Sequence, residues 1–252
     1  MQSISQLFQF ICCIGLICFP SACYSKRPVA AVDDSCNIRY AENGVPNFFK
    51  GANLSAPLDT DPEFRNLQAE KRYADIALYF LNWKRALFKL ESPRDEFLVT
   101  NVHIDSLGQK HVQLAQVFNT IPVWGKELRV HLNRENQVFF IHGAYQPITA
   151  DLITKALVSG EAAAKIVLQS RPNPAQWRIE SVDTCIWAPD NTIQRLAYIV
   201  KVLNEPVHRQ SCFVDAIDGG ILRCITETNS GTRRIGNLID VKGGLNNDQP
   251  HR

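Results

Sequence analysis

Histidine is the residue type in this chain best suited to metal or acid–base chemistry, and its spacing excludes one well-defined use. The chain has six histidines: His103, His111, His131, His142, His208 and His251. None is followed by Glu, so the chain lacks His-Glu-x-x-His, in which two imidazoles hold zinc and the carboxylate acts as base. The first four come from neighbouring predicted strands and could gather on one face. His131 and its near neighbour His103 could ligate a metal, but exposed strand histidines are much commoner, and we expect no metal site.

The acidic residues suggest no catalytic pair. Asp215 and Asp218 could bind a cation, yet beside two glycines a role in a hairpin explains them better. Asp95 and Glu96 are too close in sequence to act as a spaced acid and base, and we interpret them as polar residues before a strand. The sequence shows no nucleophile elbow, phosphate loop or dinucleotide fingerprint. We therefore expect no catalytic residues and no cofactor.

The cysteines favour an oxidising compartment. Outside the N-terminal region the chain keeps an even number of them without Cys-x-x-Cys, which favours disulfides over zinc: Cys36, Cys185, Cys212 and Cys224. Cys212 and Cys224 flank the turn signal Asp218-Gly219-Gly220, and their equal parity puts both side chains on one face if pairing is regular. We expect the disulfide Cys212–Cys224 and, by elimination, Cys36–Cys185. The alternative is that these cysteines are buried free thiols.

Residues 1–25 are predicted to be a signal peptide. Leu7–Phe19 is an apolar run broken only by Gln9, shorter than the ~20 residues that a membrane-spanning helix needs, and small residues follow it. The usual basic start is missing. Pro20-Ser21-Ala22-Cys23 also resembles the site where bacterial lipoproteins are cut before a lipidated cysteine, although Pro20 stands where an aliphatic residue is usual. We expect a secreted or periplasmic protein, with lipid anchoring to the envelope through Cys23 as the alternative.

Size and charge set broad limits on the function. The 252 residues suffice for one or two domains, and a hydrophobic content of 45% makes a buried core feasible. A formal net charge of +2 is too small to imply nucleic acid or an acidic membrane as partner. Membrane contact is therefore expected only through a lipid on Cys23.

The elements of the first half are predicted from periodicity. Residues 26–59 are rich in Asp, Asn, Gly and Pro and are predicted to be a linker or loosely packed arm. A helix follows, with Asp61 as N-cap, proline in its first turn and an apolar stripe that continues until Pro93. Strands with period two come next, over Phe97–Asp105 and Val112–Phe118. After Pro122, which we expect to break the ladder, two more follow over Glu127–Leu132 and Val138–Ile141.

The order of elements then repeats. A short helix is predicted over Gly160–Leu168, followed by these strands: Arg178–Ala188, Gln194–Asn204, Ser211–Asp215 and Gly220–Glu227. We predict an α+β protein with two tandem domains, residues 60–148 and 149–227, each with a helix packed on an antiparallel sheet. Residues 228–252 are predicted to be a flexible tail.

The segment Asn119–Gly125, with the sequence NTIPVWG, carries a family resemblance. Together with Asp95–Phe97, the strand before the segment and Val138–Tyr145, it resembles the fungalysin/thermolysin propeptide domain of thermolysin-like metallopeptidases. That family has an Asn-Gly-Ile-Pro-Val-aromatic-Gly corner and a following strand that ends in His-Leu-(Asn/Asp). Thr120 stands where the family often has Gly, so the corner has to form without the conformational freedom of glycine.

The next part of the chain is similar to the PepSY domain. Gly160–Leu168 matches its helix, Leu196–Val202 its Leu-Ala-Tyr strand and Phe213–Leu222 its closing hairpin. The two resemblances together cover about residues 60–227. They imply a cystatin-like fold for each domain.

The resemblance also implies a function. In the family this region acts as an intramolecular chaperone and temporary inhibitor of its own peptidase. It implies here a non-catalytic protein that inhibits, or assists the folding of, a thermolysin-like zinc metallopeptidase whose zinc belongs to the partner. Thr226–Arg234 would by its position enter the peptidase cleft, and a tail without a partner is the alternative. Two other hypotheses are a truncated remnant of a peptidase precursor and an envelope lipoprotein that binds an unrelated partner.

Overall fold

Strands predominate among the described residues of this protein. The computed structural model describes residues 36–191, 193–204 and 208–227, all within one unit, Asp34–Arg252. The expected signal peptide, Cys23 and the expected tail 228–252 lie outside the described residues. Within the described residues the chain is a sheet-rich mixture of α and β structure, and no helix there is long and apolar enough to cross a membrane.

The single long helix predicted before residue 93 is divided into shorter ones. They are α1 (Pro62–Ala69), α2 (Tyr73–Trp83) and α3 (Arg85–Phe88), followed by α4 (Pro93–Glu96). The Asp61 cap is confirmed, because its carboxylate accepts hydrogen bonds from the backbone N–H groups of Glu63 and Phe64. The chain leaves helical geometry at Lys71 and Lys89, each with a φ of 56°, which ends a helix. Pro93 begins a helix instead of ending one, since proline suits a first turn.

The strands before residue 148 form one antiparallel sheet. They are β1 (Asn37–Tyr40), β2 (Pro46–Lys50), β3 (Phe97–Ile104), β4 (Lys110–Phe118), β5 (Ile121–Leu132) and β6 (Val138–Ala144). Their pairings give the order β1-β2-β6-β5-β4-β3. Among the described residues β3 pairs with β4 alone, so β3 is an edge strand.

The segment predicted to be a linker or arm is, in its described part, a portion of this sheet. β2 pairs with β6, and Phe49 lies opposite Ile141. Val45, Phe49 and Leu54 are buried in the core. The prediction of a loose arm was therefore wrong. The strand that β2 needs as a partner lies far along the chain, and the polar residues between the two short strands hid their periodicity.

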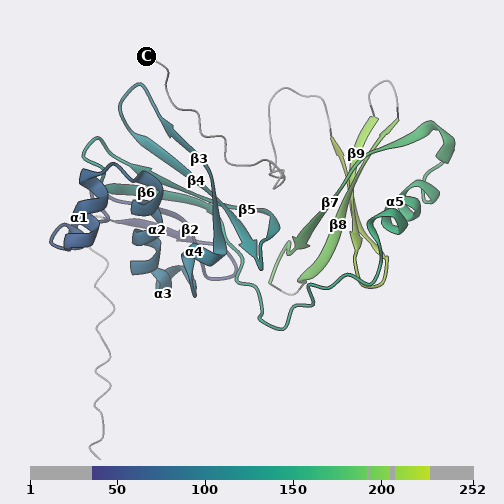
Figure 1. The fold of residues 1–252 in the computed structure, drawn as a ribbon, viewed down its shortest axis with the longest axis horizontal. Coiled ribbons are helices and arrows are strands. Elements are labelled where there is room, and N and C mark those ends of the chain that lie inside the picture. The colour runs from purple at the N-terminus through teal and green to yellow at the C-terminus, as the bar shows by residue number, and fades with distance from the viewer. Residues whose placement is uncertain (1–35, 192, 205–207, 228–252) are drawn as a thin grey trace, which may run out of the picture. The chain divides into compact units, whose positions relative to one another are not determined.

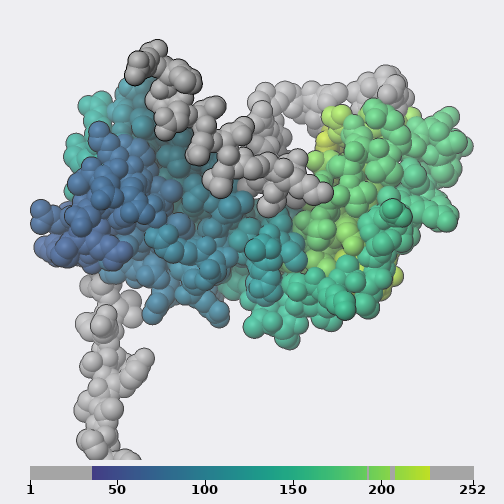
Figure 2. All heavy atoms as spheres, in the orientation of Figure 1, coloured from purple at the N-terminus to yellow at the C-terminus, as the bar shows by residue number. Residues whose placement is uncertain are grey.

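One apolar core holds the helices against this sheet (Figure 1). Its helical side chains include Phe64, Phe80 and Leu81, and its strand side chains include Leu114 and Leu128, all of them fully buried. The burial of alternate residues along β4 and β5 follows from the period of two in a strand. Figure 2 shows the segment that contains these helices (blue) as a closely packed body.

β5 is longer than predicted. It begins at Ile121 and runs through Pro122, which pairs with Val117. A register shift lies between Ala115 and Val117 in the partner strand, and such irregularities are where a sheet accommodates proline. The break expected in the ladder is present, because the pairing with β4 stops after Pro122 and resumes at Glu127, which pairs with Ala115. The strand itself nevertheless continues through this interruption.

The second half repeats a helix followed by antiparallel strands. Its elements are α5 (Gly160–Gln169), β7 (Trp177–Trp187), β8 (Arg195–Asn204), β9 (His208–Asp215) and β10 (Ile221–Glu227). Each of these strands pairs antiparallel with the next. The Ser159 hydroxyl caps α5 by accepting from Ala162 N–H. α5 packs beside these strands through Ala163 and Val167, which lie in one apolar cluster with residues of β8 and β9 (Figure 1).

Candidate functional site

The corner between β4 and β5 is built on a two-residue turn. Phe118 pairs with Ile121, and the two residues between them, Asn119 and Thr120, have φ angles of 49° and 67°. Two consecutive positive φ angles match the twist of a β-hairpin and favour Asn-Gly. Asn tolerates this conformation readily, whereas a β-branched residue does so at a cost. Thr120 therefore occupies a position for which glycine is better suited.

The residues after the turn bring β5 against the second half of the chain. Val123 pairs with Ile186 of β7 in a parallel arrangement. The Trp124 ring lies 5.2 Å from the Trp187 ring and 4.7 Å from the Phe213 ring, measured between centroids. Gly125 follows with a φ of +68°, which glycine adopts freely. The corner is thus a packing element, since its large aromatic side chain covers buried residues of β7 and β9.

A polar contact ties the segment before β3 to the end of β6. The Tyr145 hydroxyl donates to the Glu96 carboxylate. The same carboxylate accepts from the backbone N–H groups of Glu91 and Ser92, each at 2.7 Å. Burial raises the pKa of Tyr145, and the Glu96 carboxylate raises it further. Glu96 is therefore a structural anchor, and Asp95 makes a local hydrogen bond with Ser92.

Four histidines form a row across neighbouring strands of the first sheet. His103 pairs with His111 and His111 with His131 in the ladder, and the ring of His142 stacks on His131 at 5.1 Å. The prediction that these histidines gather is confirmed. His103 and His131 are not direct neighbours, because His111 lies between them in the ladder. His208 lies in β9, and His251 is outside the described residues.

The closest contact in the row joins His111 and His131. Their Nδ1 atoms are 2.6 Å apart, and His111 Nε2 is 3.0 Å from the Asp105 Oδ2 atom. Burial lowers the pKa of His131 to about 4, with smaller contributions from His142, His111 and Arg129. Within the part of the chain that the structure describes, no three side chains of metal-binding type converge.

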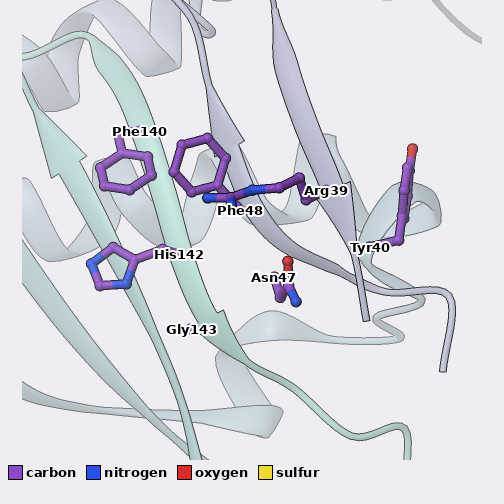
Figure 3. Close-up of a pocket in the computed structure, with 7 residues that line it drawn as sticks. All are labelled: Arg39, Tyr40, Asn47, Phe48, Phe140, His142 and Gly143. Atoms are coloured by element: carbon purple, nitrogen blue, oxygen red, sulfur yellow. The ribbon is translucent and has the colours of Figure 1, made fainter. Parts of the chain in front are cut away.

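A shallow groove has His142, the last histidine of the row, in its lining (Figure 3). It has a volume of about 570 Å³ and is lined by residues of β1, β2 and β6 and their flanks: Arg39, Tyr40, Asn47, Phe48, Phe140, His142 and Gly143. The Arg39 guanidinium carbon lies 4.0 Å from the centre of the Phe48 ring, which is a cation–π contact. This groove could not be predicted from the sequence, because β1 and β2 fall in the segment interpreted as a linker or arm. The Phe48-Phe49 pair was the signal that could have indicated a strand.

Residues 95–145 match a known family model. Its description is Fungalysin/Thermolysin Propeptide Motif. The matched segment, called here the propeptide motif, begins beside Glu96 and ends at Tyr145, the two residues joined by the hydrogen bond described above. A solved structure, the Bacillus megaterium YpeB C-terminal domain, is similar with 14% identity and a TM-score of 0.35 over 73% of each chain.

The cysteines outside the propeptide motif differ from expectation in one pair. Cys212 and Cys224 form a disulfide between β9 and β10. Cys36 and Cys185 are free thiols, so the expected Cys36–Cys185 bond is corrected. The physical reason is that Cys36 packs against the first apolar core, whereas Cys185 is buried in a separate cluster with Trp187. Cys23 lies outside the described residues.

Asp215 and Asp218 organise the hairpin between β9 and β10. The Asp215 carboxylate is buried, pairs with Arg195 at 2.9 Å and accepts from the Ile217 N–H at 2.7 Å. Asp218 accepts from the Gly220 N–H at 2.7 Å. These bonds engage both oxygens of Asp215 and one oxygen of Asp218 within the hairpin, as the structural interpretation of the two residues predicts.

Proposed function

We propose that this chain is a secreted, propeptide-like protein without catalytic activity that binds a thermolysin-like zinc metallopeptidase and inhibits it or assists its folding. The single observation that carries the proposal is the match of residues 95–145 to the propeptide motif. The turn at Asn119–Thr120 and the anchor between Glu96 and Tyr145 are consistent with that match. The sequence holds no His-Glu-x-x-His, so the zinc in this proposal belongs to the partner.

The second half of the chain is proposed to be a PepSY-like domain. It is supported by the helix α5 packed beside four consecutive antiparallel strands, which repeats the helix-on-sheet arrangement of the first half. Two tandem, cystatin-like domains are the arrangement we propose. Secretion is supported by the apolar run Leu7–Phe19 and by the Cys212–Cys224 disulfide, since disulfides persist in oxidising compartments.

The outer side of β10 is proposed as the contact with the peptidase. Within the described residues β10 pairs with β9 alone, and most of its side chains are exposed. An exposed edge strand can add a strand of a partner through main-chain hydrogen bonds. The last two residues of β10, Thr226 and Glu227, are also the first two of the segment Thr226–Arg234. They are the part of this segment that the structure describes. The remainder of this segment is proposed to enter the cleft of the peptidase.

The direction of the β10 backbone groups follows from the disulfide. The Cα atoms of Cys212 and Cys224 are 4.1 Å apart, which is typical of a pair without mutual backbone hydrogen bonds, at ~4.5 Å, and not of a hydrogen-bonded pair, at ~5.5 Å. Thr226, two residues along, therefore also directs its N–H away from β9. Proline at position 226 would remove this N–H while leaving the bonds between β9 and β10 in place.

Inhibition in solution tests the proposal. Residues 26–252, with the disulfide formed, are titrated against a mature thermolysin-like peptidase from the same source. We expect saturable, near-stoichiometric inhibition. Thr226→Pro should weaken inhibition at least about tenfold, the effect of losing about one hydrogen bond. Thr226→Val, which keeps the backbone N–H, should inhibit like the wild type.

Three outcomes would count against parts of this proposal. A folded, uncleaved protein that fails both to inhibit the peptidase and to speed its refolding would overturn the proposed function and favour a remnant or an unrelated envelope protein. Inhibition that is unchanged by Thr226→Pro would remove β10 from the interface while leaving the function intact. A covalent lipid on Cys23, detected by mass spectrometry, would replace secretion by anchoring to the envelope.

A further inference from the structure

The contact between His111 and His131 directs one nitrogen of each imidazole toward the other, as a two-imidazole metal site requires. Both residues lie directly opposite each other on β4 and β5, so two rigid strands fix their backbones. The rings meet edge to face with centroids 4.7 Å apart, and the Nδ1 atoms approach to 2.6 Å. With Zn–N bonds of ~2.0–2.1 Å, two tetrahedral ligand atoms lie about 3.3 Å apart. The two side chains therefore have to separate their Nδ1 atoms by roughly 0.7 Å on binding, while the strands keep the backbones in place.

Asp105 determines which nitrogen of His111 is free. An ionised carboxylate only accepts hydrogen bonds, so His111 Nε2–H is the donor in the 3.0 Å contact with Asp105 Oδ2. The lone pair of neutral His111 is then on Nδ1 and points at His131. A carboxylate that orients an imidazole through its second nitrogen is the usual outer partner in histidine–metal sites. The bond between the two Nδ1 atoms is therefore donated by His131.

We propose that His111 and His131 together bind one divalent cation of the kind that prefers imidazole, Zn²⁺ or Cu²⁺, through their Nδ1 atoms. On binding, the proton on His131 Nδ1 moves to His131 Nε2, which is buried and has no hydrogen-bond partner. Both imidazoles stay neutral, and the cation replaces the shared proton. This inference does not rest on the proposed inhibition of a peptidase.

The surroundings fit such a cation. Among the described residues, no third side chain of metal-binding type converges on the two histidines. Water molecules therefore complete the coordination of the cation. They can reach it because 28% of the His111 side chain is exposed. Asp105 supplies a nearby negative charge. Arg129, the neighbouring cation on β5, is paired with Glu127 at 2.9 Å. Imidazole nitrogen favours Zn²⁺ and Cu²⁺ over Mg²⁺ and Ca²⁺, and Cu²⁺ binds tighter than Zn²⁺ at a given site.

The cation would join β4 to β5 inside the propeptide motif. Because it binds the folded sheet and not the unfolded chain, it should raise the melting temperature as its concentration increases. The position is also close to the groove in Figure 3, since His142 lines that groove and stacks on His131.

Calorimetric titration of the chelator-treated full chain with Zn²⁺, Cu²⁺ and Mg²⁺ tests the proposal. We expect one equivalent of Cu²⁺, weaker binding of Zn²⁺, none of Mg²⁺, and a higher melting temperature with either of the first two. His111→Phe and His131→Phe keep an aromatic ring and should each lose the site. His208→Phe, at an exposed histidine of β9, should bind like the wild type, as should Cys36→Ser, which removes the half-buried free thiol.

The variant Asp105→Asn tests whether Asp105 orients the His111 ring, since it leaves both proposed metal ligands in place. In the wild type, one oxygen of Asp105 accepts from the backbone N–H groups of Leu107 and Gln109. Asparagine keeps an oxygen for these two bonds. Its amide nitrogen takes the place of the other oxygen and cannot accept the hydrogen bond from His111. Binding should weaken by about tenfold or more without being lost. In the Cu²⁺ complex, electron paramagnetic resonance should show coupling to two imidazole nitrogens. Binding that survives both phenylalanine variants, or wild-type protein that binds no Cu²⁺ or Zn²⁺, would overturn the proposal.

Discussion

At the scale of single residues, Thr120 is in a conformation that its side chain disfavours. Its φ of 67° lies in the left-handed region, where a β-branched residue costs roughly 1 kcal/mol or more. Thr120→Gly relieves this strain, although glycine also gains freedom in the unfolded chain. We predict that Thr120→Gly raises the free energy of unfolding by about 1 kcal/mol, measured by urea denaturation.

Asn119 supplies the matched control for this substitution. It precedes Thr120 in the same turn with a φ of 49°, but asparagine tolerates this region far better than threonine does. Asn119→Gly should therefore leave stability within about 0.5 kcal/mol of the wild type. An equal gain at both positions would mean that left-handed strain is not what distinguishes Thr120.

Cys185 is predicted to be an inert thiol. Burial raises its pKa to about 12, and Asp183 contributes in the same direction. A thiol reagent at pH 8 should label the half-buried Cys36 in the folded protein and label Cys185 only after denaturation. Mass spectrometry of the labelled peptides measures this order, and rapid labelling of Cys185 in the native protein would contradict it.

The same shift predicts how stability depends on alkaline pH. The pKa of Cys185 in the folded protein lies above that of an unfolded thiol, ~8.5, so the unfolded chain loses its proton first. The contribution of Cys185 to the free energy of unfolding is fully present when the pH lies below the pKa of the unfolded thiol. It is lost as the pH rises toward the pKa in the folded protein, about 12. Urea denaturation at pH 7.5 and 10 should show a smaller alkaline loss for Cys185→Ala than for the wild type.

At the scale of elements, β2 is an integral strand of the first sheet. Phe49 is buried and packs 6.5 Å from the Phe88 ring, whereas Tyr40 of the adjacent β1 is 51% exposed. We predict that Phe49→Ala lowers the free energy of unfolding by about 3 kcal/mol, because it leaves a cavity in the core. Tyr40→Ala should change it by less than about 1 kcal/mol, and comparable losses in urea denaturation would contradict the assignment of β2 to the core.

At the scale of the whole molecule, Trp124 is one of the side chains that join the corner of β5 to β7 and β9. It contacts Trp187 and Phe213, and the β-ladder between β5 and β7 has a single residue pair, Val123 with Ile186. We predict that Trp124→Ala costs about 2 kcal/mol, less than a fully buried tryptophan because Trp124 is half-buried. It should also make the two halves unfold separately.

Two probes can detect this loss of cooperativity. Far-UV circular dichroism and hydrogen exchange resolved by peptide should give coincident transitions for the wild type and separate ones for Trp124→Ala. Trp124→Phe keeps an aromatic ring in the same contact and should behave closer to the wild type. A single shared transition in Trp124→Ala would show that other contacts couple the two halves.

The sequence by itself determined the local elements and their caps. Alternation of apolar residues predicted β4, β6 and the strands of the second half, because a strand exposes its two faces in turn. Asp61 capped α1 as predicted, and the turn at Asp218-Gly219-Gly220 separated β9 from β10. These features depend on residues a few positions apart, whose types alone set the backbone conformation. For the same reason the propeptide motif was visible in the sequence.

Only the tertiary structure decided the pairings between distant segments. It placed β1 and β2 beside β6, left Cys36 and Cys185 unpaired, and made His111 the neighbour of both His103 and His131. An alternating apolar pattern predicts that a strand packs in a sheet, but it does not identify the strand with which it pairs. That choice depends on how the whole core closes, because a short strand such as β2 gains stability only from residues far away in the chain.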